Sequence, residues 1–138
     1  MRALLKLTAE TAARYLENLK ERSVAPSPEA LERLTELEEP MPELPIEADR
    51  ILKTLDRIGS PATMAMAGPR YFGFVIGGSL PAALAANWLA GAWDQCPGLF
   101  AASPIGTVLE EVSLRWLLDV LKLPADSGGA FVTGATRG

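Results

Sequence analysis

The most constraining feature of this sequence is the uneven distribution of its charged residues. Residues 1–60 carry 12 acidic and 9 basic side chains, whereas residues 61–138 carry 9 charged side chains in all, and residues 71–93 carry none. A segment with so few charges cannot cover its own apolar surface with polar groups. We therefore expect that something outside residues 61–138 buries this segment.

A membrane span is one alternative for the uncharged stretch. Gly77, Gly78 and Pro81 interrupt it, and too few residues remain before Asp94 for the apolar helix of about 20 residues that a bilayer requires. We predict instead a loop over residues 69–78 and a buried helix from Pro81 to about Trp93. The small residues along this helix would let another helix approach closely, as in an obligate interface.

The composition excludes several classes of active site. The chain of 138 residues has no histidine and one cysteine, Cys96, so it lacks the residues for Ser–His or Cys–His nucleophiles, for zinc sites and for an internal disulfide. Its net charge of −4 argues against nucleic-acid binding. The N-terminus has no apolar secretion signal and the single thiol suits a reducing compartment, so we expect a cytoplasmic protein.

The charged first part predicts three amphipathic helices with a structural packing role. We expect the first to begin at an N-cap at Thr8 and the second at Ser27, with Pro28 in its first position. The third is expected over residues 47–58 and is predicted to end at Gly59. Three prolines predict an extended connector between the second and third helices: Pro40, Pro42 and Pro45.

The C-terminal part contains one further helix and a candidate phosphate site. In residues 103–124, Thr107 and Glu110 fit a capping box that predicts a helix start, and Pro124 is expected to close the helix. Residues 130–133 are apolar and β-prone, and Gly134-Ala135-Thr136 follows them. Such a junction can bind phosphate through backbone N–H groups, although an ordinary turn fits the same residues. A strand here has no sheet to join, so we expect the chain to be a fragment.

Three blocks of sequence resemble the N-terminal region of the group II pyridoxal-phosphate (PLP)-dependent decarboxylases. They are GPRYFGFVIGGSLPAALAANWL (68–89), SPIGTVLEEVSLRWL (103–117) and GGAFVTGAT (128–136). The resemblance implies a mainly α chain that contains an N-terminal helical segment and the first strand of a fold-type I α/β enzyme. It implies three segments, namely amphipathic helices (1–60), an apolar loop with interface helices (61–126) and the truncated start of the PLP-binding domain (127–138).

The resemblance also implies ligand contacts. The expected residues are Ala135 and Thr136 for the cofactor phosphate, and Phe74, Val75, Ile76 and Gly77 for the substrate pocket. It further implies an obligate dimer with its active sites at the subunit interface and an amino-acid substrate. The family often has histidine where this chain has Gly68, which removes one polar group.

The resemblance assigns no catalytic residue to this chain. The family's cofactor-binding lysine, the histidine that stacks on the cofactor and the aspartate that pairs with its ring nitrogen all lie far downstream. None of the four lysines matches that position: Lys6, Lys20, Lys53 and Lys122. We therefore expect the chain to be inactive without a complementary C-terminal segment. The alternative from another class is a non-enzymatic helical domain that oligomerises and needs no cofactor.

Overall fold

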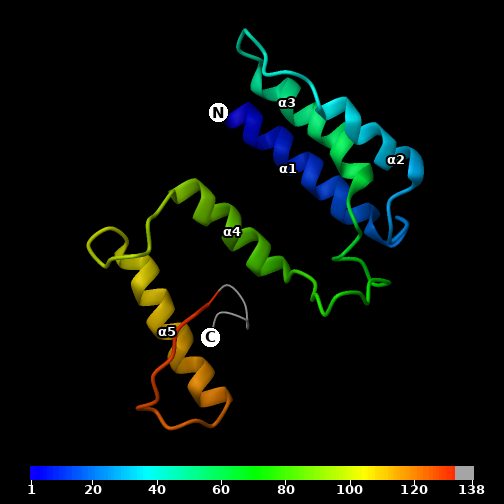
Figure 1. Cartoon of the computed structure of the whole chain (residues 1–138). Coiled ribbons are helices and arrows are strands. Elements are labelled where there is room, and N and C mark those ends of the chain that lie inside the picture. The colour runs from blue at the N-terminus through cyan, green and yellow to red at the C-terminus, as the bar shows by residue number, and fades with distance from the viewer. Residues whose placement is uncertain (133–138) are drawn as a thin grey trace. The chain divides into compact units, whose positions relative to one another are not determined.

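The computed structural model describes residues 1–132, and these residues are helical with no strand among them. The chain separates into two compact units, Met1–Ser79 and Leu80–Gly138 (Figure 1). No helix within residues 1–132 is long and apolar enough to cross a membrane. The three segments expected from charge and resemblance (1–60, 61–126 and 127–138) remain a prediction.

The first unit is built from three helical segments. They are α1 (Arg2–Glu17) with the short turn η1 (Asn18–Lys20), α2 (Pro28–Glu32) with η2 (Arg33–Leu37), and α3 (Ala48–Thr54) with η3 (Leu55–Gly59) and η4 (Ser60–Ala62). The segments lie side by side, since α1 contacts α3, η2 contacts η3 and α2 contacts η4. The predicted number and order of helices in this part are confirmed.

The helix ends in this unit confirm one prediction and correct two. Ser27 is the N-cap of α2, and its side chain accepts a hydrogen bond from the Ala30 N–H. Thr8 is not a cap, because α1 begins at Arg2 and the Thr8 hydroxyl donates to the Leu4 carbonyl one turn earlier at 3.0 Å. Gly59 does not end the third helical segment. Its backbone is right-handed helical, with φ −73° and ψ −46°, so the chain continues into η4.

Few apolar side chains are buried in the first unit, and ion pairs connect its helices. Ile58 is 1% exposed, and Leu19 and Ala65 are also buried. Between helices, Arg14 of α1 pairs with Asp56 of η3 at 2.6 Å, and Arg57 of η3 pairs with Glu36 of η2 at 2.8 Å. These contacts link the three segments to one another.

The second unit contains two longer helices. The first, α4 (Pro81–Trp93), has the predicted bounds. The second, α5 (Pro104–Val120), begins earlier than predicted, because Ser103 is the N-cap and accepts from the Gly106 N–H at 3.3 Å. The predicted capping box at Thr107 is therefore wrong. Thr107 lies in the first turn, where its hydroxyl donates to the Ser103 carbonyl.

The C-terminal end of α5 is closed by backbone hydrogen bonds. Lys122 has a left-handed φ of 57°. Its N–H donates to the Asp119 carbonyl at 3.1 Å, and the Leu123 N–H donates to the Leu118 carbonyl at 2.9 Å. This pair of bonds is the Schellman motif, which ends a helix by satisfying its last carbonyls. The helix therefore ends at Val120, four residues before Pro124, and the expectation that it extends to Pro124 is wrong, because Lys122 lies beyond the last turn in a left-handed conformation.

The predicted strand over residues 130–133 is not observed in the described residues. Ala130, Phe131 and Val132 have irregular backbone, and Thr133 lies outside the described residues. A strand is stable only when a neighbouring strand pairs with its N–H and C=O groups. Residues 1–132 contain no strand that could do so.

The second unit leaves most of its apolar surface uncovered. Among its described residues only Ser103 and Leu118 are buried, and α4 has no buried residue although it was predicted to be a buried helix. Trp116 is 70% exposed, Trp88 is 44% exposed and Trp93 is 52% exposed. Residues 1–132 therefore do not provide the cover that the uncharged sequence requires.

Candidate substrate-pocket loop and phosphate site

The segment that leads to the predicted pocket loop is held tightly by backbone contacts. The Ala65 N–H donates to the Val24 carbonyl, and the Gly68 N–H donates to the Ala65 carbonyl, both at 3.0 Å. A Cβ atom at Gly68 would lie 3.0 Å from the Ala65 carbonyl oxygen and 3.4 Å from that of Leu19. Glycine at this position therefore allows the chain to pass close to the backbone of η1.

Arg70 is the next anchor along the chain. Its Nη2 atom donates to the carbonyl of Lys20 at 2.9 Å and to the carbonyl of Arg22 at 2.5 Å. These carbonyls follow α1 and η1, where helical carbonyls lack partners within the helix and attract cations. The loop is thus fastened to the end of the first helix by a side chain that lies only two residues before Phe72.

The loop ends in a tight turn with an unusual backbone. The Ile76 N–H donates to the Gly73 carbonyl at 3.2 Å, and the two central residues, Phe74 and Val75, have φ angles of 54° and 55°. Glycine, asparagine and aspartate are the residues that normally adopt positive φ in such turns. For an aromatic and a β-branched residue, this conformation costs about 1–3 kcal/mol each, and such outliers concentrate at functional sites.

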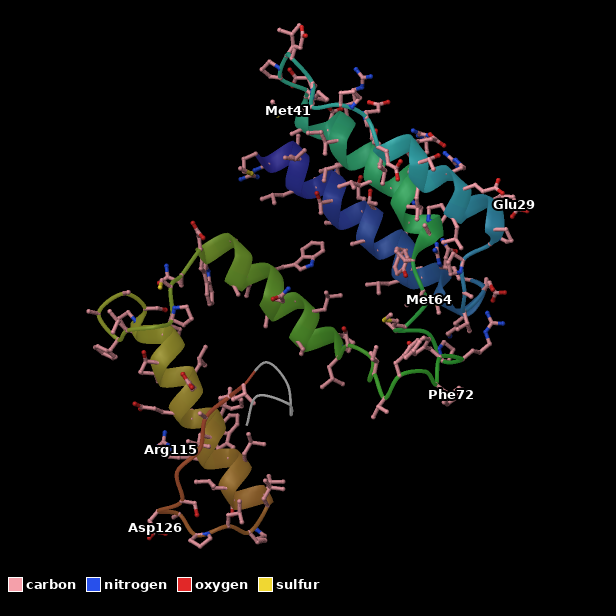
Figure 2. All side chains as sticks on the ribbon, viewed as in Figure 1. Glu29, Met41, Met64, Phe72, Arg115 and Asp126 are labelled. Atoms are coloured by element: carbon pink, nitrogen blue, oxygen red, sulfur yellow. The ribbon has the colours of Figure 1, made fainter. Side chains whose placement is uncertain are left out.

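The side chains of this loop are exposed rather than packed against the chain. Phe72 is 91% exposed, Phe74 is 83% exposed and Val75 is fully exposed (Figure 2). Ile76 and Gly77 are exposed as well. Among the described residues, no other segment covers the apolar side chains of this strained turn.

Tyr71 has a buried hydroxyl without a partner among the described residues. A Cβ atom at Gly73 would lie 3.1 Å from this hydroxyl oxygen, so the ring lies directly beneath the loop. A buried polar group without a hydrogen bond is costly. Like the exposed apolar side chains of the loop, the Tyr71 hydroxyl therefore lacks a stabilising partner among the described residues.

The predicted site residues are thus only partly described. Phe74, Val75, Ile76 and Gly77 form one continuous exposed turn, while the predicted phosphate residues Ala135 and Thr136 lie outside the described residues. The anchoring roles of Arg70 and Tyr71 were not predicted from the sequence. Both residues stand in the GPRYFGF block that carries the resemblance. The partners of Arg70 are 48–50 residues away in the sequence, and the Tyr71 hydroxyl has no partner within residues 1–132.

The described lysines do not form a PLP-binding catalytic site. Lys6, Lys53 and Lys122 each pair with a carboxylate three or four residues away on the same helix or at its end, and each side chain is well exposed. Lys20 is exposed as well. A lysine that reacts with a carbonyl cofactor is normally desolvated in a pocket, so these residues do not fit that role.

The remaining polar groups of the first unit have structural roles. The Arg33 and Arg57 side chains hydrogen-bond to Glu36 and lower the pKa of its carboxyl group, Arg33 having the larger effect. The Lys53 side chain likewise lowers the pKa of Asp49. All these groups are on the surface of the helices. Residues 1–132 contain no cluster of three potential metal ligands.

A groove between α1 and α3 is one of the hollows of the first unit. It has a volume of about 270 Å³ and a mainly apolar lining. The lining residues are Thr8, Thr11, Ala12, Tyr15, Leu52, Leu55, Asp56, Ser60 and Thr63. The predicted pocket residues Phe74–Gly77 are not among them, so this groove is not the predicted substrate site.

Comparison with known proteins identifies relatives over nearly the whole chain. No family model matches. The chain is 31% identical to the aromatic-L-amino-acid decarboxylase of Drosophila melanogaster over 130 residues, which is 90% of this chain and 25% of the relative. It is 32% identical to the Cavia porcellus enzyme of the same name over 138 residues, which is 94% of this chain and 28% of the relative.

A solved structure gives the same result. The crystal structure of Oryza sativa TDC with PLP and tryptamine superposes with a TM-score of 0.77 and 26% identity, covering 89% of this chain and 25% of that one. The chain spans about a quarter of the length of the relatives that it matches. The resemblance predicted from the sequence is confirmed: over nearly its whole length, this chain is similar to about one quarter of the length of PLP-dependent aromatic-L-amino-acid decarboxylases.

Proposed function

We propose that this chain is the N-terminal portion of a PLP-dependent amino-acid decarboxylase, and that it is not active alone. The observation that carries the proposal is that nearly all of the chain aligns with one quarter of aromatic-L-amino-acid decarboxylases. Its exposed apolar loop and helices support the proposal, because three quarters of such an enzyme would be available to cover them.

In the complete enzyme the chain has three roles. Its apolar helices α4 and α5 contribute to a homodimer interface. The loop residues Phe74–Gly77 line the pocket for an amino-acid substrate. Ala135 and Thr136 hold the cofactor phosphate, and residues 130–133 pair with the sheet of a fold-type I enzyme as its first strand. We place the enzyme in the cytoplasm.

The chemistry divides between the cofactor and the protein. PLP supplies the electron sink that makes loss of CO₂ from an amino acid possible. The residues of this chain would orient the substrate and exclude water from it, since the loop side chains are apolar. The Thr136 hydroxyl would donate a hydrogen bond to a phosphate oxygen. The relatives act on aromatic L-amino acids by name, which makes aromatic amino acids the first substrates to test.

The test is complementation. The chain is co-expressed with the remaining three quarters of Oryza sativa TDC, and PLP content and CO₂ release are measured. We expect PLP binding and decarboxylation from the pair and neither from the chain alone. Decarboxylation by the chain alone, or a well-folded pair without PLP, would contradict the proposal.

Two matched variants test the phosphate residue. Thr136→Ala should weaken PLP binding by the pair about tenfold or more, because a hydrogen bond to a charged group is lost. Thr133→Ala removes the same hydroxyl three residues earlier and should leave PLP binding within about twofold. Equal effects of the two substitutions would show that Thr136 has no special role at the phosphate.

The second candidate function is a helical oligomerisation domain without a cofactor. The exposed tryptophans of α4 and α5 favour it as well. The two candidates differ in the complementation test, because an oligomerisation domain would associate with copies of itself but would not restore PLP binding to the decarboxylase segment.

A further inference from the structure

The contacts of Arg70 fix the base of the exposed loop. Its guanidinium spans from residue 70 to the turn at residues 20–22 through two hydrogen bonds from one nitrogen, Nη2. That nitrogen carries two hydrogens, so both are used. The acceptors are backbone carbonyls, whose positions are set by the fold, so the two bonds fix the guanidinium relative to the turn. We call this pair of bonds the clamp; it differs from a surface ion pair, which joins two flexible side chains and is screened by salt.

The turn that receives Arg70 is itself well supported. The Arg22 guanidinium lies over the Tyr15 ring at 4.6 Å and donates to the Ser60 carbonyl and to the Thr63 hydroxyl. The Tyr15 hydroxyl also hydrogen-bonds to that of Thr63 at 2.8 Å. The carbonyls that Arg70 contacts therefore belong to a turn joined to α1 and to η4, which makes it a rigid point of attachment.

Beyond Arg70 the loop has little support of its own. Within the described part of the chain, residues 72–80 take part in two hydrogen bonds. The Ile76 N–H donates to the Gly73 carbonyl in the turn, and the Leu80 carbonyl accepts from the Leu84 N–H at the start of α4. The side chains of Phe72, Phe74 and Val75 are largely exposed. Arg70 is thus the last side chain that fastens the chain to the first unit before the strained turn.

We propose that Arg70 is a positioning residue for the substrate-pocket loop. It holds the loop base against the Lys20–Arg22 turn so that residues 72–76 project in one direction toward the substrate. It makes no contact with the substrate itself. The link to the substrate depends on the proposed function, whereas the clamp on the loop can be measured in this chain without it.

The first experiment measures loop position directly. Spin labels are placed at Glu29→Cys on α2 and Val75→Cys on the loop, both exposed positions of the first unit, with Cys96→Ser to remove the native thiol. The parent chain should give one narrow distance distribution, and Arg70→Met should lose it and give a broad one. Arg115→Met, which removes an exposed arginine of α5, serves as the control and should leave the distribution narrow.

A conservative variant separates positioning from folding. Arg70→Lys keeps a donor group with several hydrogens, and it should keep the narrow distribution even if Arg70→Met lowers the helix content measured by circular dichroism. A narrow distribution in Arg70→Met, or one as broad in Arg70→Lys as in Arg70→Met, would overturn the clamp.

The second experiment uses the co-expressed pair. Arg70→Met should raise the substrate KM about tenfold, because the loop loses the two charge-assisted hydrogen bonds that hold its base in place, with a smaller change in kcat and unchanged PLP binding. Arg70→Lys should have a KM close to that of the unmodified pair. If kcat and PLP binding fall by as large a factor as KM rises, Arg70 has a general folding role, and the proposal that it positions the loop is overturned. Failure of the unmodified pair to bind PLP would instead refute the proposed function and leave the distance result standing.

Discussion

The two units of this chain differ in how they are stabilised. In the first unit, buried Ile58, Leu19 and Ala65 are combined with ion pairs between helices and with the hydrogen bonds of Arg22 and Arg70. In the second unit, two longer helices have well-formed ends, but only Ser103 and Leu118 are buried among the described residues. The first unit thus has tertiary contacts of its own, whereas the second has mainly local ones.

This difference indicates which part of the chain lacks stabilising packing within the described residues. Helices of this length are marginal in water unless an apolar face is covered. The second unit therefore has good helix signals without the packing that makes helices stable. In a decarboxylase four times as long, that packing would come from the remaining sequence or from a second subunit.

The largest expected effect concerns self-association. The purified chain should form dimers or larger species, because the second unit exposes tryptophans and leucines that water disfavours. Trp88→Glu combined with Trp116→Glu should shift the mass measured by light scattering toward the monomer. The control pair Met41→Glu and Leu44→Glu changes apolar residues of the first unit that are even more exposed than the two tryptophans, and it should leave the mass unchanged. A monomeric parent chain would contradict the comparison.

The next effect concerns the core of the first unit. Ile58→Ala removes the most deeply buried apolar side chain and should lower the free energy of unfolding by about 3 kcal/mol, through lost burial and an unfilled cavity. Urea denaturation followed by circular dichroism measures this value. Ile51→Ala on the exposed side of α3 should cost about 1 kcal/mol or less. Similar costs at the two positions would show that Ile58 is not part of a stable core.

The two serine caps compare the units directly. Ser103→Ala should destabilise α5 by about 1–2 kcal/mol. Ser103 is fully buried, so removal of its hydroxyl leaves the Gly106 N–H without a hydrogen-bond partner. Ser27→Ala at the exposed cap of α2 should cost less, since water can reach the Ala30 N–H. Thermal unfolding of the two variants measures the difference. A larger cost at Ser27 would reverse the expected order.

The smallest effect is a dependence on pH. Arg33 and Arg57 lower the pKa of Glu36 below its ordinary value of 4.5. The native carboxyl group therefore binds a proton less readily than the unfolded one, and its stabilisation is present above pH 4.5 and is lost as the pH falls through the lower native pKa. Glu36→Gln should flatten this part of the stability profile slightly, since the pair is exposed. Glu39→Gln is the control, and an equal change there would contradict the assignment.

The sequence predicted most of the helices correctly, but it misplaced several of their ends. Pro81 gave the correct start of α4 and Ser27 the correct cap of α2. At α5, however, Ser103 followed by Pro104 provides a cap four residues before Thr107, and at α1 the residues before Thr8 are already good helix formers. Where two capping signals compete, the earlier one extends the helix and satisfies more backbone groups.

The resemblance predicted which residues form the candidate pocket loop, but it did not predict the conformation of that loop. Nothing in Phe74 or Val75 suggests a left-handed backbone, because these residues disfavour it. The contacts of Arg70 join residues 48–50 positions apart, and no local pattern encodes such a pairing. Both features depend on how the segments of the first unit pack together.

The sequence by itself determined that this chain is helical, that its charges gather in the first 60 residues and that its remainder is too apolar to be covered from within. These properties follow from composition, helical periodicity and capping residues, which act over a few positions. The tertiary structure decided which side chains are buried, how Arg70 fastens the loop and which turn carries strain. These properties arise from contacts between distant segments, and their energies depend on geometry that residue types alone do not specify.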